Sequence, residues 1–136
     1  MPAFVRSILS VLAAALAAWI TVAAVEAASM MAFPLPPGVT FETPGFVEHV
    51  PLGGKIGVLL AWTLGPLVGG YIAARWAPRS PLAHALAIGA VFTLADAFNL
   101  YQYPSPLWMV AYGLAAPLPA AWLGAQLALR PKAEAA

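Results

Sequence analysis

The sequence contains no cysteine and very few charged residues. The absence of cysteine from all 136 residues excludes disulfide bonds, thiolate nucleophiles and cysteine-ligated metal centres. Charged residues make up 8% of the chain, whereas an average soluble domain has about 25%. So few charges could not cover the surface of a water-soluble globule, while a hydrophobic content of 62% suits a chain surrounded by lipid. The composition therefore predicts an integral membrane protein.

Motifs for catalysis and nucleotide binding are also missing. The sequence has no GxSxG, no P-loop and no GxGxxG that follows a strand. A net charge of +1 and the lack of a basic run give no reason to expect nucleic acid as a partner. No cofactor or bound metal is predicted, and nothing in the sequence marks the chain as an enzyme.

Four apolar stretches are long enough to cross a bilayer, which takes roughly 20 helical residues. They cover about residues 7–32, 56–74, 82–101 and 107–129. The last three are joined by short turns, which make neighbouring helices antiparallel. We therefore expect an all-α membrane protein, a bundle of four transmembrane helices that forms one domain over residues 1–136.

The connection over residues 33–55 is the only long one. It begins with FPLPPG, a string that favours an extended, polyproline-like conformation. Further on, Thr43 as N-cap and Pro44 at the first helical position predict a short helix. We expect this loop to lie at the membrane interface, partly buried against the bundle.

The basic residues predict the orientation, because cytoplasmic loops collect Lys and Arg. With four spans, five of the six basic residues fall on one side of the membrane. Both termini are therefore expected in the cytoplasm and the loop at 33–55 outside. The five residues are Arg6, Arg75, Arg79, Arg130 and Lys132, and Lys55 alone falls on the other side.

The first apolar stretch has a second interpretation. Arg6, the apolar run after it and Val25-Glu26-Ala27 before Ala28 resemble a secretory signal peptide with a cleavage site. The run is long for a signal peptide, so an uncleaved helix is the favoured interpretation.

Small residues form stripes at helical spacing on the second and fourth spans. Such stripes let helices approach closely in lipid, either within one chain or between a chain and a partner. Packing within the chain is the favoured interpretation, because these patterns are common in transmembrane helices. The residues expected to pack helices together are Gly65, Gly69, Gly113, Ala116, Ala120 and Gly124.

Two acidic residues lie inside the predicted spans, where a charge costs at least ~2.5–3.5 kcal/mol and needs a reason. Asp96 shares a helical stripe with Thr93, and Asn99 lies close beside it. This polar stripe predicts a face that points into the bundle or into a wet cavity. Glu26 is expected at a similar depth, either turned inward or reaching the outer interface.

His49 on the outer loop is a candidate neighbour of the two acidic residues. A carboxylate–histidine set made of Glu26, His49 and Asp96 would suit proton transfer or a divalent metal ion. No HExxH or comparable spacing supports the metal. His84, at the cytoplasmic start of the third span, is expected to be an interface residue rather than a ligand. The candidate polar site comprises Glu26, His49, Thr93, Asp96 and Asn99.

Several local strings occur together along the chain. They are FPLPPG at 33–38, WTLG at 62–65, GGYIAAR at 69–75, PSPLW at 104–108 and PLPAA at 117–121, with Glu26, Asn99 and Gly124. Together they resemble a group of small bacterial inner-membrane proteins of unknown function. The resemblance implies four helices and a multi-pass location in the bacterial inner membrane, and it implies no activity. The four-helix multidrug exporters differ, because their essential Glu lies deep in the first span and Glu26 lies near its outer end.

The sequence leads to three functional hypotheses. The leading one is an accessory or scaffold protein that acts through helix–helix contacts in the lipid bilayer, with another membrane protein or a second copy as its partner. The second is a small proton-coupled transporter that uses Asp96 and Glu26 in a bundle kinked by mid-span prolines. The third is a metal or catalytic site at the outer face that involves His49.

Overall fold

The computed structural model describes residues 1–133, and within them every regular element is a helix. Four helical segments are long and apolar enough to cross a bilayer. This finding agrees with the expected all-α fold with four spans. Residues 134–136 of the predicted domain lie outside the described part of the chain. The helices are α1 (Ala3–Ala32), α2 (Phe46–His49), α3 (Leu52–Trp76), α4 (Pro81–Gln102), α5 (Leu107–Ala115) and α6 (Pro117–Ala128).

The fourth span is two helices rather than one. α5 ends at Ala115 and α6 begins at Pro117, with Ala116 as the cap residue between them. Pro117 and Pro119 have no backbone N–H, so the carbonyl groups one turn earlier lose their helical donors. Pro66 lies inside α3, and that helix continues through it.

The short helix α2 starts two residues later than the sequence predicts. Its N-cap is Gly45, which takes the left-handed conformation with φ 66° that glycine adopts without strain. The Thr43 hydroxyl accepts a hydrogen bond from the backbone N–H of Thr40 over 2.9 Å. Thr43 therefore stabilises the preceding turn instead of capping α2, and the prediction that Pro44 opens the helix was wrong.

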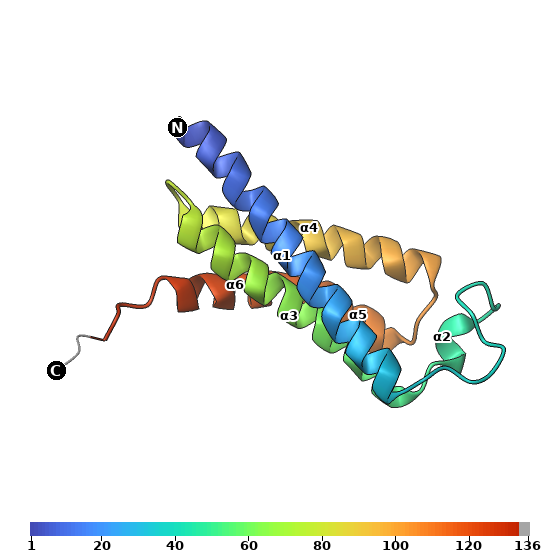
Figure 1. Ribbon diagram of the computed structural model, residues 1–136. Helices are drawn as coiled ribbons and strands as arrows, with labels where there is room; N and C mark the ends of the chain where they lie inside the picture. The colour runs from blue at the N-terminus through green and yellow to red at the C-terminus, as the bar shows by residue number, and fades with distance from the viewer. Residues whose placement is uncertain (134–136) are drawn as a thin grey trace.

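Different segments of the chain lie at the two ends of the bundle (Figure 1). The N-terminus, the residues that follow α6 up to Ala133, and the turn between α3 and α4 lie at one end, which we call the terminal end. The segment 33–51 with α2 lies at the other, the loop end. Arg6 in the first turns of α1 and Arg75 in the last turn of α3 both belong to the terminal end. The basic residues expected on one side of a membrane thus come from segments that meet at one end of the molecule.

Helix α3 is the centre of the bundle, because it packs against α1, α4 and α6. Glycines make these contacts close. A Cβ atom on Gly69 would lie 2.9 Å from the Cβ of Ala18 in α1. A Cβ on Gly124 in α6 would overlap the carbonyl of Leu67 and come within 2.7 Å of the backbone nitrogen of Tyr71. Helices at this separation tolerate no added methyl group.

The residues that the sequence singled out for packing lie on faces that meet within this chain. Gly65 faces Val22 and Ala18 of α1, and Gly113 of α5 faces the ring of Trp62. Ala120 is buried, and Ala116 is half-buried at the break between α5 and α6. By contrast, large apolar side chains point outward over the middle of the helices, as a bilayer requires. Examples are Leu12, Leu16, Ile20, Leu94 and Phe98.

Candidate functional site

Glu26 turns into the bundle, so the structure decides between the two directions that the sequence allowed. The indole Nε1 of Trp62 in α3 donates a hydrogen bond to Oε1 of Glu26 in α1, over 3.2 Å. Trp62 is itself buried, with 5% of its surface exposed, and its ring packs on Gly113. Because the ring is buried and packed on Gly113, its N–H can orient the carboxyl group.

Asp96 is the most deeply buried charged residue of the described chain, with 4% of its surface exposed. Its Oδ2 atom is buried and has no hydrogen-bond partner. The carboxyl group lies close enough to Glu26 for the two to interact electrostatically. Two acidic groups, one from α1 and one from α4, therefore face the same part of the interior.

Among the described residues, neither carboxyl group forms an ion pair with a basic side chain. A buried charge is normally paired, hydrogen-bonded or bound to a metal ion. Glu26 has the indole of Trp62 as its partner, and Asp96 has none. Such an arrangement is costly for stability, and intramembrane acids of this kind usually mark a functional site.

A cavity of about 150 Å³ lies at the loop end and includes Glu26 in its wall. It is lined by residues of α1, α3, α4 and α5, and by the loop that carries α2. Most of its wall is apolar, with Met30, Val58 and Met109 among the lining residues. Its other polar or charged lining side chains, besides the Trp62 indole, are Ser29, Lys55, Asn99, Tyr103 and Ser105.

An aromatic cluster joins the loop to the bundle above this cavity. The ring centroids of Phe41 and Phe46 lie 4.9 Å apart, and those of Phe46 and Tyr103 lie 5.8 Å apart. Val47 of α2 is buried beneath the loop. The loop packs against the bundle through these side chains, and the aromatic cluster forms part of the cavity wall.

Ser29 lies one helical turn beyond Glu26 on the same face of α1. It lines the cavity, and its hydroxyl oxygen is buried without a hydrogen-bond partner. A hydroxyl group in such a place loses its hydrogen bonds to water and gains none from the protein. The Ser29 oxygen lies against Gly57 of α3, where an added Cβ atom would overlap it.

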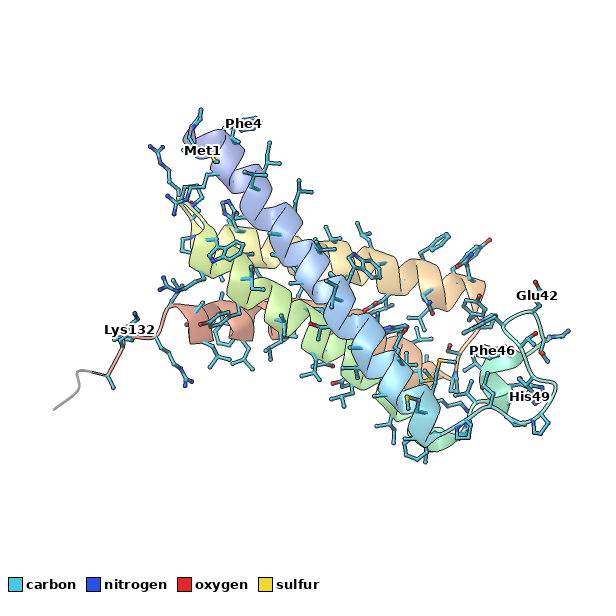
Figure 2. The ribbon with its side chains drawn as sticks, in the orientation of Figure 1. Met1, Phe4, Glu42, Phe46, His49 and Lys132 are labelled. Atoms are coloured by element: carbon cyan, nitrogen blue, oxygen red, sulfur yellow. The ribbon has the colours of Figure 1, made fainter. Side chains whose placement is uncertain are left out.

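The other predicted site residues lie in different surroundings. Thr93 donates its hydroxyl hydrogen bond to the carbonyl of Gly89 in its own helix, over 2.8 Å. Asn99 lines the cavity one turn beyond Asp96. His49 is exposed on the part of the loop that projects away from the helices (Figure 2), and it is not among the residues that line the cavity.

The structure gives the metal hypothesis no cluster of ligands. Within residues 1–133, no group of three or more His, Asp or Glu side chains is placed to hold a metal ion. His84 lies at the terminal end, where its ring nitrogens contact the carbonyl of Ser80 at 3.1 Å and the hydroxyl of Ser7 at 3.0 Å. It thereby links α4 to α1, far from the cavity.

Sequence reasoning missed Trp62 and Ser29 as parts of this site. A signal for Trp62 was present, because tryptophan in membrane proteins prefers the interface and Trp62 lies in the interior of its span. Ser29 could have been found by its spacing, since residues three apart on a helix lie on one face.

The chain matches no protein-family model, no curated protein and no solved structure. An argument about function therefore rests on the cavity, its polar residues and their surroundings.

Proposed function

We propose that this protein is a small membrane carrier. Its substrate, a small amphipathic molecule, binds in the cavity at the loop end. The observation that carries the proposal is a cavity of about 150 Å³ with an oriented acidic group in its wall. A cavity of about this size is large enough for one benzene ring. Binding sites for small molecules are typically apolar cavities with a few polar groups that orient the ligand.

The two carboxyl groups support a carrier rather than a static binding protein. Acidic groups inside a membrane are costly, and they commonly belong to substrate or proton pathways. Glu26 lines the cavity, whereas Asp96 is buried in the interior and is not one of the lining residues. Ile88 and Phe92 are fully buried along the helix from Asp96 toward the terminal end, and they fill the bundle there. This arrangement places the binding site at the loop end and a closely packed bundle at the terminal end.

The orientation and location belong to the same proposal. We place both termini in the cytoplasm and the cavity on the outer side, in the inner membrane of a bacterium. The support for the orientation is the excess of Lys and Arg at the terminal end, which the positive-inside rule assigns to the cytoplasm. The support for the location is the sequence resemblance described above.

The scaffold hypothesis stays an untested alternative. Its motivation was that small-residue faces outnumber polar ones, and these faces pack against one another within the chain. The surfaces that remain on the spans are apolar side chains of the kind that face lipid. If the purified chain is a dimer, or carries a second membrane protein with it in mild detergent, the scaffold hypothesis regains its support.

The binding proposal can be tested with a neutral probe of one-ring size, 2-phenylethanol, and the protein in phosphatidylcholine nanodiscs. Equilibrium dialysis against empty nanodiscs separates saturable binding from partition into lipid. The variant Val58→Phe adds a ring to the cavity wall, whereas Leu60→Phe adds one to a half-exposed position on the same helix. We expect saturable binding to be lost in Val58→Phe and kept in Leu60→Phe. Equal binding by both variants, or no saturable binding to the unmodified protein, would refute the proposal.

A further inference from the structure

We propose that the ligand of the loop-end cavity is a small organic cation, with a primary ammonium group on an apolar body about the size of one aromatic ring. This inference rests on the proposed function, because it names the class of molecule that the cavity takes. It goes further, since it assigns the ammonium group to Glu26 and the apolar body to the aromatic cluster of Phe41, Phe46 and Tyr103.

The first argument is charge. Glu26 is in the cavity wall with Asp96 nearby, and in the described chain no basic side chain pairs with either. The basic lining residue, Lys55, lies two helical turns before Trp62 on α3, or about 10 Å toward the loop end. The part of the cavity near Glu26 is therefore acidic. A cation is the ligand that compensates the Glu26 carboxylate there.

The second argument is hydrogen bonding. A primary ammonium group has three donors and no acceptor. The cavity wall offers an acceptor that the protein leaves unused. Trp62 occupies Oε1 of Glu26, which leaves Oε2 for a second donor. Asn99 also lines the cavity. An ammonium group would satisfy the free carboxyl oxygen of Glu26, whereas an anionic ligand has no donor for it.

The third argument is size and surface. The apolar part of the wall includes Phe41, Phe46 and Tyr103, whose ring centroids lie 4.9 to 6.3 Å apart. Aromatic faces attract both apolar groups and cations. A volume of about 150 Å³ has room for one ring and excludes multi-ring cations. The same wall gives an elongated acyl chain little space.

The test compares four probes that share one ring and differ in charge. They are 2-phenylethylamine, 2-phenylethanol, phenylacetate and phenylalanine, each measured by equilibrium dialysis with the full chain in phosphatidylcholine nanodiscs at pH 7. We expect the amine to bind about tenfold more tightly than the alcohol, which corresponds to one charge-assisted hydrogen bond. Phenylalanine tests the zwitterionic alternative, in which a carboxylate would reach Lys55.

The variant Glu26→Gln removes the negative charge and keeps an acceptor for Trp62. We expect it to bring the amine's affinity down to that of the alcohol. Glu42→Gln removes the same charge from an exposed position on the loop, so it serves as the matched control and should change neither affinity. The comparison of the four probes on the unmodified protein keeps the test decisive if Glu26→Gln does not fold.

The outcomes separate this inference from the proposed function. Saturable binding of the amine and the alcohol with equal affinity would overturn the cation assignment and leave the binding site in place. Tighter binding of phenylalanine or phenylacetate than of the amine would also overturn it. No saturable binding of any of the four probes would refute both proposals.

Discussion

The indole N–H of Trp62 donates a hydrogen bond to the carboxyl group of Glu26 over 3.2 Å, and this bond joins α3 to α1 at the wall of the cavity. It explains why an acidic residue near the end of a lipid-facing helix turns inward. It also leaves one carboxyl oxygen available to a ligand. The bond therefore serves both the packing of the two helices and the proposed binding site.

Replacing Trp62 with phenylalanine should destabilise the protein. The ring remains, while the donor to Glu26 is lost and a half-buried carboxyl group is left without its partner. Side-chain hydrogen bonds in membrane proteins are worth about 0.6 kcal/mol on average and up to about 1.7, so we expect a loss in that range. Unfolding by SDS in mixed micelles measures it. Trp122→Phe, at a half-exposed position on α6, is the control, and an equal effect of both variants would contradict the prediction.

Replacing Asp96 with leucine should stabilise the protein. Asp96 is buried, and one of its carboxyl oxygens has no hydrogen-bond partner. An apolar side chain of similar size removes the desolvation cost of such a group, which is about 1–3 kcal/mol. The same SDS titration should show a higher free energy of unfolding. Asp96→Asn keeps an unpartnered polar group and should show no such gain. A loss of stability in Asp96→Leu would mean that the carboxyl group has a partner.

Adding one methyl group to Gly124 should loosen the contact between α3 and α6. The new Cβ would overlap the backbone of Leu67 and Tyr71, and backbone atoms cannot move aside as a flexible side chain can. Overpacking of this kind costs typically about 1–3 kcal/mol. Gly124→Ala should therefore unfold at a lower SDS fraction than the unmodified protein. Ala87→Leu adds more atoms at an exposed position of α4 and should leave the midpoint unchanged.

The orientation can be read directly, because the chain has no cysteine of its own. Glu42 on the loop and Ala133 beyond α6 are both exposed positions for single cysteines. Figure 2 shows Glu42 and Lys132, the residue before Ala133, at opposite ends of the molecule. A membrane-impermeant maleimide applied to intact bacterial cells should label Glu42→Cys, and should label Ala133→Cys only after the cells are opened. The reverse pattern would place the cavity on the cytoplasmic side.

Much of the fold follows from local features of the sequence. The number and approximate limits of the spans depend on the length of each apolar run, because a helix must bury about 30 Å of backbone in hydrocarbon. The inward face of α4 around Asp96 also followed from the spacing of polar residues. The start of α2 could not be predicted in this way, because both Thr43 and Gly45 can precede a helix. In the structure Gly45 is the N-cap, and the hydroxyl of Thr43 accepts a hydrogen bond from Thr40 in the preceding turn.

The sequence by itself determined that this chain is a membrane protein with four spans, with basic residues gathered on one side and two acids inside the spans. Those properties depend on composition and on residues that are neighbours along the chain. Only the tertiary structure decided that Glu26 meets Trp62, which is 36 residues away, and that His49 lies apart from both. The rotation of each helix about its axis decides which side chains meet. That rotation is set by the close approach of α3 to its neighbours at glycine and alanine positions, a property of several helices packed together.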